Sequence, residues 1–258
     1  MSPGPLALVG SGEYLPVMAD VEALLLKTSA PTASTPEAST PEASAPTASA
    51  PRYVQLPTAA APEGERSLRH WLDLGAAQAQ RLGAEQVPLL VRDRSEADKP
   101  ELAAEVAGAS LIYLSGGSPT YLAQTLRGTR VWEAILAAWQ SGSALAGCSA
   151  GAIALTGWVP AMRALHREPD PGLGLLPDMR VLPHFDKMLG WIPDLLPRAL
   201  ADTPAGTTVL GIDEDTAIVD LTGAGHTWQV HGRQQVWVLA NGFRQPYPPG
   251  TTISIPSA

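Results

Sequence analysis

A short apolar run, Ala144-Leu145-Ala146, leads directly into Gly147-Cys148-Ser149-Ala150-Gly151. The pattern Gly-x-Ser-x-Gly between a strand and a helix is typical of a sharp turn whose central serine projects above the edge of a sheet. The backbone N–H after that serine points toward the position of a developing oxyanion. The stretch therefore predicts a buried strand, a nucleophile at Ser149 and a helix over about 151–155.

Two other interpretations of this turn stay open. It could be a tight packing turn without chemistry, or Cys148, the only cysteine of the chain, could be the nucleophile. Because Ser149 holds the central position, we expect Cys148 to point into the fold, where a lone cysteine behaves as a small buried hydrophobe. A single cysteine also excludes an intrachain disulfide and a cysteine zinc cluster.

Apolar runs alternate with helical patterns over the first two thirds of the chain. We expect strands at 6–10, 53–56, 87–91, 111–114 and 144–146, and helices at 16–27, 67–82, 99–106, 120–126, 131–140 and 151–155. This alternation favours the α/β class, with a mainly parallel sheet and helices on both faces. Closely spaced strands at 209–212, 216–221, 227–230 and 235–239 favour antiparallel hairpins near the C-terminus that close one edge.

The segment 29–52 differs from its surroundings in composition. Positions 29–51 contain only Ser, Ala, Pro, Thr and Glu, and the pieces Thr-Pro-Glu-Ala-Ser and Ala-Pro-Thr-Ala-Ser each occur twice. Such a segment has too few apolar side chains to offset the entropy of ordering. We therefore expect a single domain over 1–258 with a disordered, low-complexity insertion at 29–52. A proline-rich ligand for a partner is the alternative.

Composition limits the classes of function. The 258 residues carry a formal net charge of −8, which argues against the basic surface that nucleic-acid binding requires. We find neither a signal-peptide pattern nor the run of about 20 apolar residues that a membrane helix needs. We therefore expect a cytoplasmic protein without nucleic-acid or membrane partners, and the sequence leaves a homodimer open.

A serine nucleophile needs a base, and the chain has five histidines. His184 is the first choice, because residues 181–183 read as a strand end that opens into a loop, where the sites of α/β proteins gather. His166, in a polar loop, is the alternative. Structural or surface roles fit the remaining three: His70, His226 and His231.

A third group would orient the histidine and stabilise its charged form. Three carboxylates lie between the serine and the histidine, and spacing does not choose among them: Glu168, Asp170 and Asp178. A second suggestive loop, 115–118, contains adjacent glycines directly after a predicted strand, and these let backbone N–H groups approach a ligand closely. The loop could supply a second oxyanion donor, and it lacks the lysine of a phosphate-binding P-loop.

Five motifs follow one another along the chain: Leu114-Ser-Gly-Gly117, Gly147-Cys-Ser-Ala-Gly-Ala152, Gly172-Leu-Gly-Leu-Leu-Pro177, Pro183-His-Phe-Asp186 and Gly211-Ile-Asp-Glu-Asp-Thr-Ala217. In this order they resemble the S51 serine peptidases, the group that contains cyanophycinase and α-aspartyl dipeptidase. Members of that family have a fold similar to class I glutamine amidotransferase domains. The resemblance covers about 6–218, interrupted by the insertion.

The resemblance implies an activity and a set of residues. The activity is hydrolysis of an amide bond in a small peptide, an aspartyl dipeptide or a cyanophycin-like substrate, through a Ser-His-acid triad and an acyl-enzyme, without metal or organic cofactor. The implied residues are Ser149 as nucleophile, His184 as base, Glu168 as acid, and Gly116, Gly117 and Ala150 as oxyanion and substrate contacts. An esterase or acyl transferase, and a non-catalytic binding module, are the alternatives.

Further positions bear on positioning and specificity. Glu13 matches the family's loop after the first strand, where hydrogen bonding to neighbouring loops and catalysis are both open roles. Ser118-Pro119 stands where family members of known specificity carry an Asp, Asn or Gln that contacts substrate. Arg198 and Arg163 are candidates for the cation that would hold an aspartyl carboxylate. The sequence thus leaves the substrate open.

Overall fold

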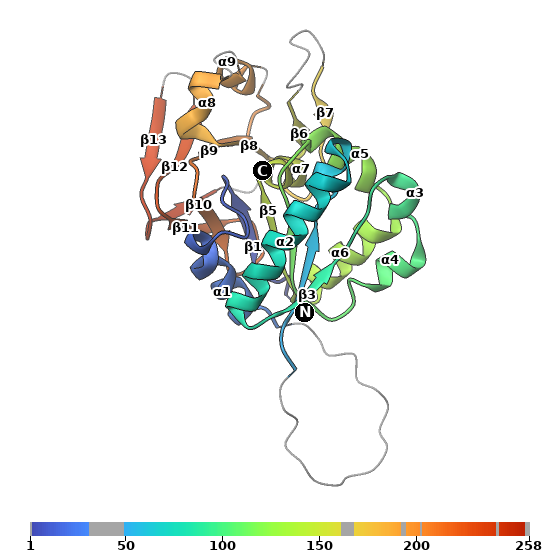
Figure 1. The fold of residues 1–258 in the computed structure, drawn as a ribbon. Helices are drawn as coiled ribbons and strands as arrows, with labels where there is room; N and C mark the ends of the chain where they lie inside the picture. Colours follow the sequence, from blue (N-terminus) through green and yellow to red (C-terminus); the bar gives the residue numbers. More distant parts are fainter. Residues whose placement is uncertain are drawn as a thin grey trace.

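An eight-stranded sheet forms the centre of the molecule (Figure 1). The structure is a computed structural model that describes residues 2–30, 49–160, 168–191, 195–201, 203–240 and 243–255. The strands of the large sheet are β1 (Leu6–Val9), β2 (Arg52–Leu56), β3 (Glu85–Pro88), β4 (Ala109–Leu114), β5 (Ala144–Cys148), β10 (Thr216–Asp220), β11 (Thr227–Gly232) and β14 (Thr252–Ser254).

The strand order of this sheet is β14-β11-β10-β1-β5-β4-β2-β3. From β1 to β3 all neighbouring strands pair in parallel. On the other side of β1, the strands β10, β11 and β14 pair antiparallel. The predicted α/β class, with a mainly parallel sheet and antiparallel strands from the C-terminal part, is confirmed.

Helices cover both faces of the large sheet (Figure 1). One face carries α1 (Ala19–Thr28) and α2 (Glu65–Leu82). The opposite face carries α3 (Arg94–Ala97), α4 (Pro100–Ala104), α5 (Pro119–Leu126), α6 (Arg130–Gln140) and α7 (Ala150–Leu155). Short 3-10 helices precede α1 (η1, Pro16–Met18) and α2 (η2, Thr58–Glu63).

The positions of the β1 side chains explain why residues 6–9 are all apolar, without alternating polar residues. Ala7 and Val9 pack in the core on the α1 and α2 side, whereas Leu6 and Leu8 pack in the core on the opposite side. A parallel strand with helices on both faces buries every side chain, so apolar residues need not alternate with polar ones. The strand predicted at 6–10 is thereby confirmed.

The segment 29–52 lies between α1, which ends at Thr28, and β2, which begins at Arg52 and belongs to the same sheet as β1. The backbone N–H of Ala30 still donates to the carbonyl oxygen of Gly142 at 2.9 Å. Residues 31–48 lie outside the described residues, so the expected disorder of the insertion stays a prediction.

A second, four-stranded sheet has the order β13-β12-β9-β8. It consists of β8 (Met179–Pro183), β9 (Thr208–Ile212), β12 (Val236–Ala240) and β13 (Phe243–Tyr247), and α8 (Phe185–Trp191) and α9 (Leu195–Leu200) accompany it. A two-stranded piece contains β6 (Trp158–Val159) and β7 (Asp170–Pro171).

The late strands are divided between the two sheets, which the sequence did not indicate. β10 and β11 form the expected antiparallel hairpin in the large sheet, and β14 is the edge strand beyond them. β9 instead pairs in parallel with β8, and only its other neighbour, β12, is antiparallel. An apolar run of five residues looks the same with either kind of partner, so the pattern could not separate them.

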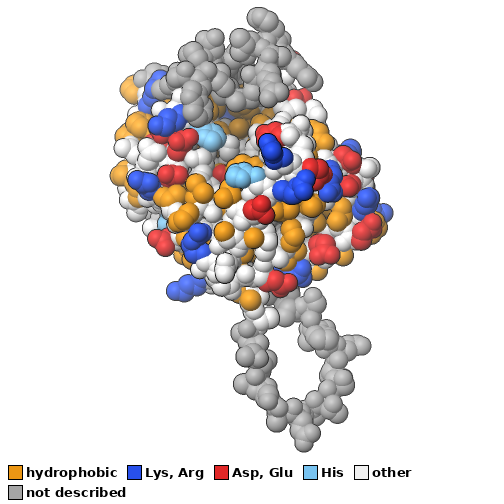
Figure 2. Space-filling view, in the orientation of Figure 1, with side chains coloured by type: hydrophobic (Ala, Val, Ile, Leu, Met, Phe, Trp, Pro, Cys, Tyr) orange, Lys and Arg blue, Asp and Glu red, His pale blue; other side chains and the backbone are white. Residues whose placement is uncertain are grey.

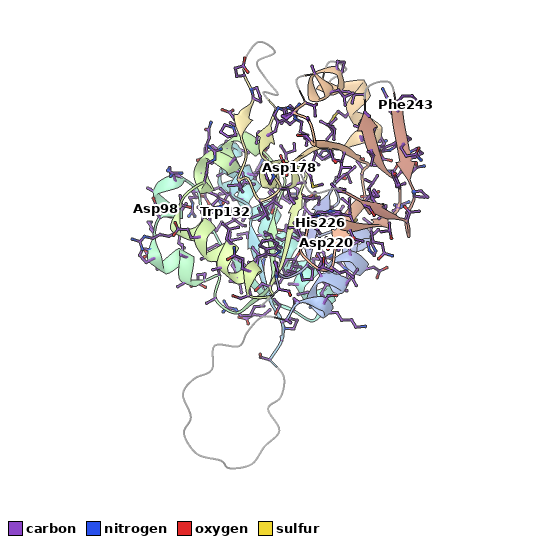
Figure 3. All side chains as sticks on the ribbon, turned by 180° about the vertical axis from the view of Figure 1, so that it is seen from behind. Asp98, Trp132, Asp178, Asp220, His226 and Phe243 are labelled. Atoms are coloured by element: carbon purple, nitrogen blue, oxygen red, sulfur yellow. The ribbon has the colours of Figure 1, made fainter. Side chains whose placement is uncertain are left out.

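The surface carries mixed charge. Figure 2 shows Lys and Arg side chains interspersed with Asp and Glu side chains over the face that is drawn. Seen from behind, Phe243 lies on the outer strand β13 (Figure 3), and it is 77% exposed. Within the described ranges, we find no helix that is both long enough and apolar enough to cross a membrane.

Candidate active site

Ser149 lies in the turn between β5 and α7, with φ +50° and ψ −107°. This backbone conformation is costly for a residue with a side chain, and such strain is typical of functional turns. Two glycines permit the turn. A Cβ on Gly147 would lie 2.5 Å from the carbonyl carbon of Gly151, and a Cβ on Gly151 would lie 2.3 Å from the carbonyl oxygen of Leu114. The Gly-x-Ser-x-Gly pattern is therefore a requirement of close backbone approach.

Cys148, the rival nucleophile, is fully buried in the core on the α1 and α2 side. Its thiol donates a hydrogen bond to Glu13 Oε2 at 2.8 Å. Burial, and after it the negative charge of Glu13, raises the pKa of this thiol well above its ordinary value. The thiolate needed for nucleophilic attack is therefore disfavoured. The side chain points into the fold, as expected.

His184 directly follows β8 and faces the serine turn. Its Nε2 lies 2.6 Å from Ser149 Oγ. A neutral imidazole with its proton on Nδ1 accepts the hydrogen bond of the serine hydroxyl at Nε2. The fold therefore brings together the two residues that the sequence analysis chose as nucleophile and base. The alternative base, His166, lies outside the described residues.

A carboxylate lies on the other side of the imidazole. Glu214 Oε1 is 3.4 Å from His184 Nδ1, and both side chains are about one third exposed (30% and 29%). The register of the second sheet explains this proximity, because Pro183 of β8 pairs with Ile212 of β9. Parallel strands end at the same edge, so the residues that follow them emerge side by side.

The three carboxylates considered from the sequence have other positions. Glu168 is exposed just before β7, and Asp170 is the first residue of β7. Asp178 precedes β8 (Figure 3), so the whole strand separates it from His184. Between described residues, no hydrogen bond or ion pair joins Glu168 to His184. The carboxylate that the fold brings to Nδ1 is Glu214 instead, from the quoted motif 211–217.

Two side chains hold the backbone of Glu214 in place. Its N–H donates to Asp186 Oδ1 at 3.0 Å. Gln234 Nε2 donates both to Asp186 Oδ2 at 3.2 Å and to the carbonyl oxygen of Glu214 at 2.9 Å. The neighbouring Asp213 is buried and accepts from Trp237 Nε1 at 3.0 Å, and burial raises the pKa of its carboxyl. The loop that carries Glu214 is thus fixed on both sides.

The glycine loop 115–117 lies beside the serine. A Cβ on Gly116 would be 3.5 Å from Ser149 Cβ, and a Cβ on Gly117 would be 2.4 Å from the carbonyl oxygen of Ala59. The N–H of Gly116 is already engaged, because it donates to Glu13 Oε1 at 2.7 Å. The N–H groups of Gly117 and Ala150 make no hydrogen bond with other described residues. Glu13 has the expected contact with a neighbouring loop.

The positions tied to specificity are only partly described. Ser118 is the N-cap of α5, where its Oγ accepts from the N–H of Tyr121 at 3.3 Å, and Pro119 is the first helical residue. The departure Ser118-Pro119 therefore has a role in starting a helix. Arg163 lies outside the described residues, and so does the side chain of Arg198 on α9. No group of three or more potential metal ligands occurs in the described part of the chain.

Comparison with known proteins adds independent support. The model of peptidase family S51 matches residues 41–224. Cyanophycinases of Synechococcus elongatus and Thermosynechococcus vestitus are each 32% identical over 161 residues, which is 58% of this chain and 48% of each relative. The chain thus spans about half the length of the curated relatives it matches.

Two solved structures are similar over nearly the whole chain. A peptidase from an acI-B1 Actinobacterium is 40% identical with a TM-score of 0.84, covering 98% of this chain and 97% of that one. A putative peptidase E from Listeria monocytogenes EGD-e has a TM-score of 0.57 at 17% identity, covering 90% of this chain and 100% of that one, and this likeness concerns the fold alone. On the family match and the 40% identical structure, this chain belongs to peptidase family S51.

Proposed function

We propose that this protein is a serine-type peptidase that hydrolyses an amide bond in a small peptide, with Ser149 as nucleophile and His184 as base. The observation that carries the proposal is the 2.6 Å contact between Ser149 Oγ and His184 Nε2 at a strained turn. A serine at its free pKa is a weak nucleophile, and a histidine at this distance is the usual means of activating it. Membership in family S51 supports the same class of reaction.

The chemistry follows from the positions of these atoms. His184 Nε2 takes the hydroxyl proton as Ser149 Oγ attacks the carbonyl carbon, and the carbonyl oxygen becomes an oxyanion. The N–H groups of Gly117 and Ala150 donate to that oxyanion. The C–N bond then breaks, His184 protonates the leaving amine, and the acyl group stays on Ser149. Water, deprotonated by His184, then attacks the ester carbonyl; the C–O bond to Ser149 breaks, His184 returns the proton to Ser149 Oγ, and the acid leaves.

We assign the third position to Glu214 in this proposal. Its carboxylate accepts from the Nδ1–H of His184, which fixes the tautomer with a lone pair on Nε2. The negative charge also stabilises the imidazolium that forms when His184 takes the serine proton. Glu168, the residue chosen from the resemblance, has no such contact among the described residues.

Several finer points remain predictions. An aspartyl dipeptide and a cyanophycin-like peptide are the candidate substrates. The names of the cyanophycinase relatives support the second, although the chain matches only about half their length. A cytoplasmic location and a homodimer are further expectations that the proposal keeps.

A fluorophosphonate probe tests the nucleophile without knowledge of the substrate. We expect it to label wild-type protein at Ser149, and Ser149→Ala and His184→Ala to lose both labelling and turnover. Ser95→Ala, at an exposed serine within α3, is the matched control. A panel of dipeptides and short-chain esters then separates a peptidase from an esterase. Folded wild-type protein that neither reacts with the probe nor hydrolyses the panel would be a binding module instead.

A further inference from the structure

Glu13 lies in the loop after β1 and is only 5% exposed. Each oxygen of its carboxylate accepts one hydrogen bond. Oε1 accepts from the backbone N–H of Gly116 at 2.7 Å, and Oε2 accepts from the thiol of Cys148 at 2.8 Å. These two partners lie more than 100 positions from Glu13 in the chain, so the carboxylate joins the loop after β1 to the loop after β4 and to the end of β5.

Both partners of Glu13 flank the nucleophile. Cys148 is the residue directly before Ser149, and a Cβ on Gly116 would be 3.5 Å from Ser149 Cβ. Gly117, one donor proposed for the oxyanion, directly follows Gly116, and Ala150, the other, follows Cys148 by two residues. The distance between the two N–H groups therefore depends on how the glycine loop sits against the serine turn.

The next residue strengthens the same connection. Tyr14 has φ +63° and is buried, and its hydroxyl lies 2.9 Å from Ser115 Oγ. Its backbone N–H donates to Glu22 Oε1 at 3.3 Å. A left-handed tyrosine persists only where its surroundings hold it. The loop after β1 therefore has a well-defined conformation, and it contacts the glycine loop through both Glu13 and Tyr14.

The surroundings of Glu13 fit a structural carboxylate better than an acid or base. No ion pair to Glu13 occurs among the described residues, so the N–H and the S–H are the groups that compensate for its burial. The thiol remains protonated because burial and the carboxylate both disfavour the thiolate, so it stays a donor. No hydrogen bond between described residues connects Glu13 to the side chains of Ser149 or His184.

We infer that Glu13 is a positioning residue that bridges the glycine loop and the serine turn, and thereby sets the separation of the Gly117 and Ala150 N–H groups around the oxyanion. This inference rests on the proposed function. It assigns no proton transfer to Glu13. Its consequence is that the length of the side chain matters more than its charge.

Two substitutions separate length from charge. Glu13→Gln keeps the length, and its amide oxygen can accept from Gly116 N–H while its NH₂ group faces the sulfur of Cys148. Glu13→Asp keeps the charge but is one methylene shorter, so it cannot reach both partners. Asp220→Asn is the control, because Asp220 is likewise a buried carboxylate and accepts from Thr222 N–H at 2.8 Å. Asp220 (labelled in Figure 3) pairs with Leu6 at the start of β1, whereas Glu13 follows the end of that strand.

The readout is the rate at which a fluorophosphonate labels Ser149 in folded protein, together with kcat and KM on any dipeptide that wild type cleaves. We expect Glu13→Asp to slow labelling by about 10²-fold, as the loss of an oxyanion donor does, and to lower kcat with KM little changed. Glu13→Gln should keep much more of the rate. Asp220→Asn should lose thermal stability without losing labelling rate.

A labelling rate for folded Glu13→Asp equal to wild type would overturn the inference, and so would a Glu13→Gln variant slower than Glu13→Asp. If Glu13→Asp does not fold, the comparison of Glu13→Gln with Cys148→Ala decides instead. Each variant disturbs only the bridge to Cys148, so their effects on labelling should overlap in the double variant. Fully additive effects would contradict a bridge. Failure of wild-type protein to react at Ser149 would refute the proposed function, which is a different outcome.

Discussion

Glu214 Oε1 lies 3.4 Å from His184 Nδ1, although the two residues are 30 positions apart in the chain. The contact arises because β8 and β9 are parallel and in register, with Pro183 opposite Ile212. The histidine follows one strand and the carboxylate follows the next, so both emerge at one edge of the second sheet. Asp186, two residues after His184, binds the backbone N–H of Glu214 at 3.0 Å and closes this arrangement.

Removing the charge of Glu214 should therefore impair turnover. Glu214→Gln is expected to lower kcat by about 10²-fold or more, because the imidazolium loses its counter-charge and its preferred tautomer. Steady-state kinetics on a cleaved dipeptide measure this. Glu105→Gln, at an exposed glutamate directly after α4, is the control. If Glu168→Gln, and not Glu214→Gln, abolishes turnover, the third position belongs to Glu168.

Asp186 should act only through Glu214. Asp186→Ala leaves the N–H of Glu214 without its acceptor and removes one of the two acceptors of the Gln234 amide, and we expect kcat to fall by about 10-fold. The double variant Asp186→Ala/Glu214→Gln should be no slower than Glu214→Gln alone. Once the Glu214 carboxylate is absent, positioning of its backbone by Asp186 no longer affects the rate. Measured kcat values for the three variants check this. Multiplying effects would show that Asp186 has a separate role.

The buried carboxyl of Glu22 should make stability depend on pH. It accepts from Tyr53 OH at 2.8 Å, and burial raises its pKa from 4.5 to about 7. The folded protein thus keeps a proton between these values that the unfolded chain releases. The free energy of unfolding should therefore fall as the pH rises from about 4.5 to about 7, by about 3 kcal/mol from this group, and stay level above that.

Glu22→Gln removes this dependence, because an amide does not titrate. Urea unfolding of wild type and variant at several pH values measures it. The variant should gain stability relative to wild type as the pH rises through the same window. Two stability curves that stay parallel from pH 4.5 to 7 would contradict the raised pKa of Glu22.

The segment between α1 and β2 should be dispensable. Replacing residues 31–48 with a short Gly-Ser linker keeps the hydrogen bond between Ala30 and Gly142. Loop closure costs only about 0.6 kcal/mol for each doubling of length, so we expect little change in Tm or in turnover. Thermal unfolding and the labelling assay measure both. A large drop in Tm would refute the interpretation of this segment as a disordered insertion.

Local chemistry explains how far the sequence could predict the site. The turn around Ser149 needs glycines at 147 and 151 because other backbone atoms lie too close to leave room for a Cβ there. Both glycines are within two residues of Ser149, so the pattern can be recognised from the local sequence. His184 could be chosen because an apolar strand pattern ends just before it. The carboxylate was sought between these two residues in the chain. The carboxylate that lies against His184 in the structure follows β9, which pairs in parallel with β8, whereas the sequence analysis placed the strand at 209–212 among antiparallel hairpins.

By itself, the sequence determined the α/β class, the strand and turn that carry Ser149, and the burial of Cys148, because each depends on residues close together in the chain. Only the tertiary structure decided which carboxylate meets the histidine and what Glu13 touches. Both contacts join loops from different strands, and strand pairing sets their distances. The sequence of a five-residue apolar strand does not show which strand it pairs with or in which direction. Those contacts can therefore be identified only from the folded sheets.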